Sequence, residues 1–429
     1  MRPTDSNRRT FLRAAARAPL RLLWPAWMPR LAFAQADEDP RGDTLIVIFL
    51  RGAADALNLI PPHGEDAYYR ARPTLSIPRP DDPRSRITGR AIDLDGFFGL
   101  HPAMRPLLDA WQQGQLAIVQ ACGAPDESRS HFKAMELMER GITSEVGPAS
   151  GWLGRHLATH GGNNHSPLRA IGLGETVPRS LYGSVPVTAL RQLTAFHLND
   201  DPRAARQLRG LLKTLYQEPN EPGEVGRETL GVLELLEKLD PAGYRPTSGV
   251  NYPDSEFGLG LKQIAMLIKA EVGLEVATID SSGWDTHFVQ GGSSGLMAGL
   301  IHDLAAGLAA LHADLAEQLG RLTVVVMSEF GRRVAENASL GTDHGHGGAM
   351  LLLGGNVAGG MVHGSWPGLQ ARQLVGPGDL AVTTDYRDVL AEVCELRLNN
   401  RALAEIFPAY TPTFRGIVRT SSDPVPAGT

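Results

Sequence analysis

The stretch DTLIVIFLRG, residues 43–52, decides the fold class. It is a run of Leu, Ile, Val and Phe closed by glycine, which is typical of a strand buried on both faces. Four later stretches have the same form: QLAIVQACG (115–123), LEVATIDSSG (274–283), RLTVVVMSEFG (321–331) and AMLLLGG (349–355). Strands of this kind belong to mostly parallel sheets that helices cover on both sides.

Helical patterns fill the gaps between these five stretches. The clearest are SHFKAMELMERG (130–141), FGLGLKQIAMLIKAEVG (257–273) and LIHDLAAGLAALHADLAEQLG (300–320). Buried strands alternating with amphipathic helices predict a three-layer α/β/α sandwich with a mostly parallel central sheet. From 191 to 247 the strand pattern stops, and two helical stretches predict a helical insertion in a single α/β domain that runs from 43 to 429.

Composition narrows the classes of partner. The 429 residues are 42% hydrophobic and 21% charged, which suffices for a large core, and the net charge is −6. Basic residues are not interleaved with aromatic ones, so we expect no nucleic-acid partner. The two cysteines, Cys122 and Cys394, fit neither a zinc knuckle nor a disulfide framework, and the sequence leaves open whether they pair.

The N-terminal segment, residues 1–36, has the features of an export signal. RRTFL (8–12) is followed by a modestly apolar run and then by small-residue cleavage signals, AFA (32–34) and AQA (34–36). This order is typical of twin-arginine signals, so we expect a periplasmic or secreted protein. Arginines interrupt the apolar run, which falls short of the roughly 20 residues that cross a bilayer, so we expect no transmembrane segment there. Twin-arginine export carries folded proteins, which favours a chain with a bound cofactor.

Polar residues follow several of the predicted strands. Asp55 comes after the first strand, Asp285 and His287 come after the third, and Glu329 closes the fourth. In an open α/β sheet, ligands bind beyond the carboxyl ends of the strands. These side chains are therefore expected at one edge of the sheet.

The loop GTDHGHGG (341–348) lies between the fourth and fifth strands and belongs to the same edge. Its glycines permit positive φ and close backbone approach. Carboxylates and imidazoles that converge are costly to hold unless a cation neutralises them. The sequence thus predicts a metal site from among Asp55, Asp285, His287, Glu329, Asp343, His344 and His346.

Mixed oxygen and nitrogen ligands suit Zn²⁺ or Mn²⁺, as one or two ions, with Mg²⁺ or Ca²⁺ as the alternatives. A purely structural loop is the competing interpretation, because a histidine there can bond a backbone carbonyl and an aspartate can cap a turn.

Ser130 lies where a predicted helix begins, which leaves two roles open. It is either a nucleophile activated by a metal and the helix N-terminus, or an ordinary N-cap. His131 follows it and either lines the pocket or packs on the helix. Arg51 either clamps a substrate oxyanion or pairs with an acidic side chain. Ser130, His131 and Arg51 are the candidate catalytic residues.

Five blocks together resemble a known family. VIFLRGAADALNLIPP, SRSHF, GWDTH, SEFGRRVAEN and GTDHGHGG are similar to the blocks of the exported domain-of-unknown-function family 1501, in the alkaline-phosphatase-like (sulfatase-like) superfamily. The resemblance runs from about residue 43 to the C-terminus. It implies an alkaline-phosphatase-like sandwich with Asp55 on one metal and Ser130 as nucleophile. Asp285 and His287 would hold a second metal with His344 or His346.

The chain departs from the superfamily pattern at three places. Glu329-Phe330 stands where an Asp-His pair is usual, and Asp285 and His287 are two positions apart instead of four. These departures put two complete metal sites in doubt. Cys122 has Pro125 three positions on, followed by an aspartate, so the formylglycine pattern of sulfatases is not met.

Three classes of function remain open from the sequence. The first is a metal-dependent hydrolase of a phosphate or sulfate ester, borne by a small molecule or a polymer, with Ser130 attacking. The second is a non-catalytic binding or assembly protein on the same fold, acting with a co-exported partner. The third is a phosphotransferase or isomerase of the same superfamily, which would pass the group to another acceptor.

Overall fold

The computed structural model describes residues 43–160, 164, 166–193, 198–199, 201–217 and 221–419. The predicted export signal in residues 1–36 lies outside these residues. Within them, nine strands form one sheet. In spatial order they are β10 (Val362–His363), β4 (Leu116–Gly123), β9 (Gly348–Leu353), β8 (Leu322–Ser328), β1 (Thr44–Arg51), β7 (Val276–Ser282), β5 (Ala170–Leu173) and β6 (Thr188–Leu190), with β11 (Thr384–Asp385) paired to β4.

Strand β1 lies at the centre of the sheet because it is apolar on both faces. Leu45, Val47 and Phe49 pack into one hydrophobic cluster, and the alternating residues Ile46 and Ile48 pack into another. Successive side chains of a strand point to opposite faces, so an unbroken apolar run requires cover on both sides. The two clusters are the cores of the two helix-covered faces.

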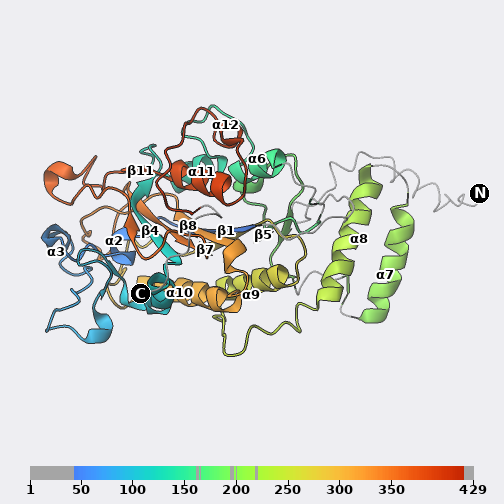
Figure 1. Ribbon diagram of the computed structural model, residues 1–429, viewed down its shortest axis with the longest axis horizontal. Helices are drawn as coiled ribbons and strands as arrows, with labels where there is room; N and C mark the ends of the chain where they lie inside the picture. Colours follow the sequence, from blue (N-terminus) through green and yellow to red (C-terminus); the bar gives the residue numbers. More distant parts are fainter. Residues whose placement is uncertain are drawn as a thin grey trace, which may run out of the picture.

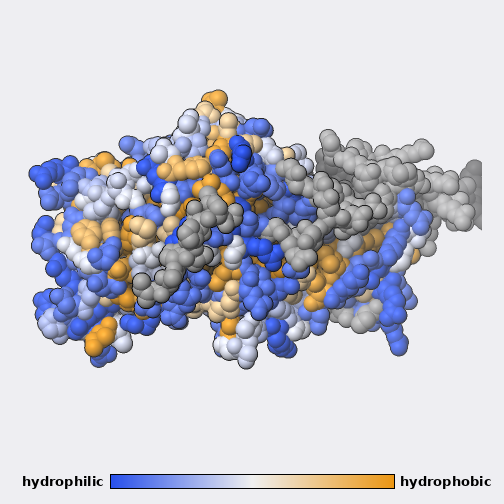
Figure 2. Space-filling view, in the orientation of Figure 1, coloured by the Kyte–Doolittle hydropathy of each residue, from blue (hydrophilic) through white to orange (hydrophobic). Residues whose placement is uncertain are grey.

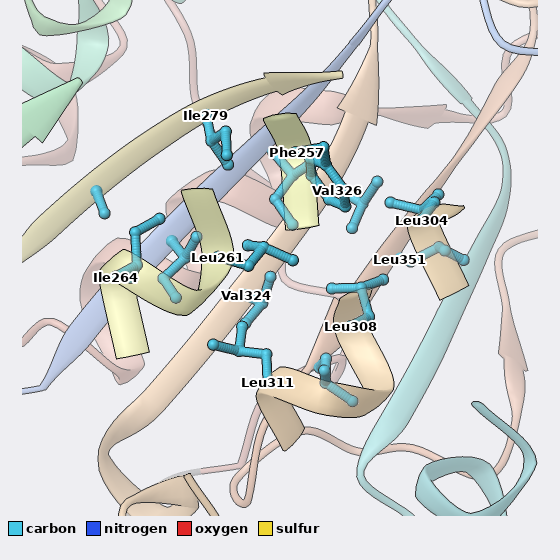
Figure 3. Close-up of a cluster of buried hydrophobic side chains, with 14 of the residues drawn as sticks. Phe257, Leu261, Ile264, Ile279, Leu304, Leu308, Leu311, Val324, Val326 and Leu351 are labelled. Atoms are coloured by element: carbon cyan, nitrogen blue, oxygen red, sulfur yellow. The ribbon is translucent and has the colours of Figure 1, made fainter. Parts of the chain in front are cut away.

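Helices cover both faces of the sheet (Figure 1). On one face lie α9 (Glu256–Lys269) and α10 (Leu296–Asp314), whose apolar side chains meet those of the central strands (Figure 3). On the other lie α5 (His131–Arg140), α6 (Trp152–Thr159), α11 (Tyr386–Leu396) and α12 (Leu403–Ile406). Helix α10 is long and apolar enough to cross a membrane by length and composition alone, but 56% of its apolar window is buried, as in a core helix.

Shorter elements and an appended pair of helices complete the described chain. Helices α7 (Pro202–Leu215) and α8 (Glu221–Leu239) lie side by side at one end of the molecule (Figure 1), within the stretch predicted as a helical insertion. The surface on the viewed face is mainly hydrophilic, with hydrophobic residues in separate patches (Figure 2). The short elements are α2 (Ala56–Leu59), α3 (Asp66–Ala71), α4 (Leu108–Gln112), and the two-stranded sheet of β2 (Ile92–Asp93) and β3 (Gly99–Leu100), with short 3-10 turns including Pro102–Leu107.

The predicted three-layer, mostly parallel sandwich is confirmed. All five predicted strands form, as β1, β4, β7, β8 and β9. One direction was not foreseen: β9 runs antiparallel to both β8 and β4. Because β9 returns beside β8, the intervening loop must cross the edge where β8 ends. The carboxyl ends of β1, β4, β7 and β8 therefore share one edge with the loop GTDHGHGG.

Candidate metal centre

Four donor side chains from three segments converge at this edge. His131 begins α5, Asp285 and His287 follow β7, and His344 lies in the loop between β8 and β9. Asp285 Oδ1 lies 3.0 Å from His287 Nε2 and 3.2 Å from His344 Nε2, and Asp285 Oδ2 lies 3.5 Å from His131 Nε2. The Asp285 side chain is 47% exposed, so the cluster is open to solvent on that side.

The Nδ1 atom of each histidine faces a hydrogen-bond acceptor. His131 Nδ1 lies 2.7 Å from Glu329 Oε1, and His344 Nδ1 lies 2.9 Å from the backbone carbonyl of Arg129. His287 Nδ1 faces Asp343 Oδ1 at 3.5 Å. A proton on Nδ1 satisfies each of these acceptors and leaves a lone pair on Nε2, which is how metal-binding histidines are held.

In that protonation state the Nε2 atoms of the three histidines face Asp285 or one another, and none of these neighbours donates a hydrogen. His131 Nε2 is buried and has no hydrogen-bond partner among the described residues. His287 Nε2 and His344 Nε2 are only 2.9 Å apart. Two lone pairs at that distance repel each other unless a proton or a cation lies between them. Three imidazole nitrogens and one carboxylate are a donor set that fits a divalent transition metal.

The charge of Asp285 is preserved by its surroundings. Burial alone would raise its pKa, but the hydrogen bond from Arg332, with smaller contributions from His344 and His287, holds the pKa of Asp285 at about 2. Burial lowers the pKa of His344, against the opposing effect of its bond to Asp285. The pair is thus an ionised carboxylate beside a neutral imidazole, which is the form in which both bind metals.

Arg332 anchors the edge by binding backbone as well as Asp285. Its buried guanidinium donates from Nε to the carbonyl of Ala53 at 2.7 Å, from Nη1 to that of Thr342 at 2.8 Å, and from Nη2 to Asp285 Oδ1 at 2.6 Å. One side chain therefore connects the segments after β1, β7 and β8. Because it is fully buried, it is a positioning residue and does not reach a substrate.

Close backbone packing explains the glycines of GTDHGHGG. A Cβ on Gly345 would lie 2.4 Å from the carbonyl carbon of Arg332, and one on Gly341 would lie 2.3 Å from that of His287. Neither glycine has a positive φ, so close approach, not backbone freedom, requires them. Residues 331–333 and 343–346 run antiparallel here, with Gly345 N–H donating to Gly331 and Gly331 N–H donating to His346. The packing fixes His344 over the edge.

Glu329 and Phe330 contact the histidines of the cluster and fix the positions of their rings. The buried Glu329 carboxylate accepts the backbone N–H of Gly52 at 2.9 Å as well as His131 Nδ1. The Phe330 ring stacks on His131, with centroids 5.1 Å apart, and contacts His344 at 5.0 Å. Phe330 is thus an apolar support for the two rings, and α5 supplies an imidazole through His131.

Asp55, predicted as a metal ligand, has another partner. Its Oδ2 lies 2.5 Å from Arg72 Nη1, with both side chains fully buried, and it also accepts Gln290 Nε2 at 2.7 Å. The arginine supplies the positive charge that the sequence argument assigned to a metal. Asp55 thus belongs to a buried ion pair, while its Oδ1 has no hydrogen-bond partner among the described residues, and its predicted ligand role stays a prediction.

Four further predicted residues, His346, Arg51, Glu329 and Asp343, have partners other than a metal or a substrate. His346 Nε2 lies 2.8 Å from the carbonyl of Ala124, so this histidine ties two loops together. Arg51 pairs with Glu139 and Asp280, which makes it a salt-bridge partner and not an oxyanion clamp. Glu329 and Asp343 orient histidines and do not join the donor cluster themselves. His131, given a catalytic role from the sequence, joins the cluster as a donor.

Ser130 is the N-cap of α5, but its hydroxyl makes no capping hydrogen bond within the described residues. The side chain is exposed and directly precedes His131. The N-cap interpretation thus holds for the backbone position only. The hydroxyl is not used in capping, which leaves the nucleophile hypothesis open.

Sequence reasoning missed two supporting amides. Asn337 donates from Nδ2 to Asp343 Oδ1 and to the carbonyl of His287, both at 3.0 Å. Gln290 accepts the hydroxyls of Thr286 and Thr342 at 2.9 and 2.7 Å while donating to Asp55. No local pattern marks these residues, since each also bonds a partner at least 50 positions away, His287 for Asn337 and Asp55 and Thr342 for Gln290.

The fold and site define a class: an α/β sandwich with a candidate metal centre at the carboxyl edge of its sheet, formed by His131, Asp285 and His344 with His287 beside them. The chain belongs to the family described as protein of unknown function, DUF1501, whose model matches residues 43–397. The comparison with curated proteins found no match.

Solved structures similar to this chain include sulfatase- and phosphatase-type proteins. A sulfatase from Pseudoalteromonas sp. is 12% identical with a TM-score of 0.32, over 76% of this chain and 64% of that one. The zinc complex of the C-terminal periplasmic domain of EcEptC from Escherichia coli is 12% identical with a TM-score of 0.31, over 77% of each chain. Alkaline phosphatase from the Antarctic bacterium TAB5 is 9% identical with a TM-score of 0.29, over 74% of this chain and 93% of that one. Likenesses this distant identify no substrate.

Proposed function

We propose that this chain is an exported, metal-dependent hydrolase of a phosphate or sulfate ester. The observation that carries the proposal is the convergence of three bare Nε2 atoms on the ionised carboxylate of Asp285, at an edge open to solvent. The paired arginines at Arg8 and Arg9 support export.

His131, His287, His344 and Asp285 would hold the metal. A set dominated by imidazole nitrogen favours Zn²⁺, with Mn²⁺ as the alternative, whereas Mg²⁺ and Ca²⁺ prefer all-oxygen ligands. The metal, when bound, supplies Lewis acidity that stabilises negative charge developing on the ester oxygens. With a single donor cluster found in the described chain, we propose one ion.

Ser130 is the candidate nucleophile. Its Oγ would form a bond to the phosphorus or sulfur of the ester while the bond to the leaving alcohol breaks, with the hydroxyl proton passing to the departing alkoxide. Water would then release the group from the serine as phosphate or sulfate. The exposed position immediately before His131, at the N-terminus of α5, supports this role, since a helix N-terminus favours the oxyanion.

The test combines metal analysis with a screen of phosphate and sulfate esters. Protein purified without chelators should contain about one equivalent of transition metal, as this donor set requires. Ser130→Ala and Ser130→Asp should keep their fold and metal yet lose at least about 10³-fold in turnover on the best substrate.

Each outcome separates the alternatives. Metal-free protein would point to a binding or assembly protein and remove the hydrolase proposal. Transfer of the group to an added alcohol would indicate a phosphotransferase. Wild-type turnover in Ser130→Asp would rule out the serine as nucleophile.

A further inference from the structure

Four large, exposed apolar side chains belong to the segments that carry the histidines of the metal centre or to the loop paired with one of them. Phe132 is 84% exposed, Phe288 71%, Val289 68% and Leu340 49%. We call these four residues the apolar rim. Single exposed apolar residues are ordinary on protein surfaces, but several beside one candidate site indicate a binding surface.

Two of the rim residues, Val289 and Leu340, have a strained backbone conformation. Val289 N–H donates to the carbonyl of Ser339 at 3.0 Å and Gln290 N–H donates to that of Leu340 at 2.9 Å, so the two loops lie side by side. Val289 has a φ of 43° and Leu340 a φ of 57°. Bulky residues rarely adopt the left-handed region, and strain of this kind concentrates at functional sites.

The rim is continuous with the metal centre. Phe132 directly follows His131, and Phe288 directly follows His287. The rings of these two histidines contact that of His344, with centroids 4.3 and 4.5 Å away. The ring of Phe288 lies 6.5 Å from that of His287, between centroids, so a ligand at the cluster can reach this part of the rim.

The charges at the cluster determine the other end of the ligand. Two partly exposed arginines, Arg129 and Arg333, both lie beside the buried Asp379. Counting also Arg332 against Asp285, Glu329 and Asp343, three positive groups face four negative ones, a net charge of −1. A bound divalent cation reverses this to +1, which favours an anion.

We propose that the apolar rim binds the apolar part of an amphiphilic substrate, a phosphate or sulfate ester of a long-chain or aromatic alcohol, whose anionic group lies at the metal centre. This inference rests on the proposed function for the position of the anionic group. The apolar rim adds the prediction that the alcohol part of the ester is apolar.

The experiment compares dodecyl phosphate with ethyl phosphate, below the micelle concentration, on metal-loaded protein. Calorimetry measures binding of each, and phosphate release measures turnover separately. Each buried methylene is worth about fourfold in affinity. With only three methylenes buried on the rim, dodecyl phosphate should bind about fiftyfold more tightly than ethyl phosphate.

A double variant, Phe288→Ser with Leu340→Ser, should remove most of this preference while leaving metal content and ethyl phosphate affinity unchanged. The matched control is Leu211→Ser on α7, where the leucine is 68% exposed at the far end of the molecule (Figure 1). It should keep the wild-type preference.

Equal affinity for the two esters in wild type, or an undiminished preference in the double variant, would overturn the inference. So would a wild-type dimer that the double variant converts to monomer without any ester preference, since the rim would then contact a second copy. Preferential binding of dodecyl phosphate, with hydrolysis of neither dodecyl phosphate nor dodecyl sulfate, would refute the proposed hydrolase function and leave the rim inference standing. Equal hydrolysis of both esters would support the hydrolase function and refute the rim inference.

Discussion

Replacing Glu329 by glutamine should weaken metal binding without harming the fold. The carboxylate is buried and accepts from His131 Nδ1 at 2.7 Å and from Gly52 N–H at 2.9 Å, both at Oε1. In Glu329→Gln the amide oxygen can keep both bonds. The amide nitrogen takes the place of Oε2, 3.0 Å from Ser328 Oγ, which can still donate to the carbonyl of Leu50. Only the charge is lost.

The loss of charge should lower metal affinity by roughly 10- to 100-fold, about 1.4–2.7 kcal/mol, as for other acceptors behind metal-binding histidines. The carboxylate strengthens the Nδ1 bond of His131 and so raises the basicity of Nε2. At a free metal concentration of about 100 times the wild-type Kd, metal stabilises wild type by about 2.7 kcal/mol. A 100-fold weaker site would gain only about 0.4 kcal/mol under the same conditions.

Two measurements check this: competition with a chromophoric chelator and denaturant unfolding with and without metal. The matched control is Glu392→Gln, whose buried carboxylate accepts the backbone N–H of Arg415, Gly416 and Val418 away from the site. Glu392→Gln should lower stability with and without metal alike and leave affinity intact. Wild-type affinity in folded Glu329→Gln would refute the role assigned to the carboxylate.

Three further changes give distinct expected outcomes. His287→Ala should weaken metal binding by at least about 100-fold, whereas His346→Ala should leave metal content unchanged because that ring bonds a backbone carbonyl; equal effects in elemental analysis would contradict the donor assignment. Gln290→Leu strands the buried partners of its amide and should destabilise the protein by about 2–5 kcal/mol in urea unfolding, and a loss under about 1 kcal/mol would show that the network is dispensable. Replacing Arg8 and Arg9 together by lysine should leave precursor in the cytoplasm on fractionation, and normal periplasmic levels would argue against twin-arginine export.

Apolar runs made the sheet predictable from sequence. All five continuous runs form strands. They were recognisable because a strand buried on both faces is apolar at nearly every position. Strands such as β5 and β6 were missed because they are three or four residues long and their apolar content does not stand out. The antiparallel direction of β9 was also not predictable, since it depends on the path of the loop before it.

Proximity at the edge was predictable, and the roles of individual residues were not. Asp285, His287 and His344 follow strands whose carboxyl ends share an edge, so their convergence follows from topology. The sequence does not show which histidine of GTDHGHGG faces the cluster. His344 and His346 are separated by a single glycine, so the path of the loop decides which side chain points toward the other donors. The structure resolves the choice through their partners, the carbonyls of Arg129 and Ala124.

The sequence argument for a cation rested on converging carboxylates, and the structure shows a second way to neutralise them. Converging carboxylates do need positive charge, yet arginine can supply it, as Arg72 does for Asp55 and Arg332 does for Asp285. An imidazole nitrogen with a bare lone pair is different, because it needs a proton donor or a metal aimed at it. The second neighbouring Nε2, that of His344 or His287, offers no hydrogen to the first when both rings carry their protons on Nδ1. The histidines, not the carboxylates, are therefore the features of this edge that call for a metal ion.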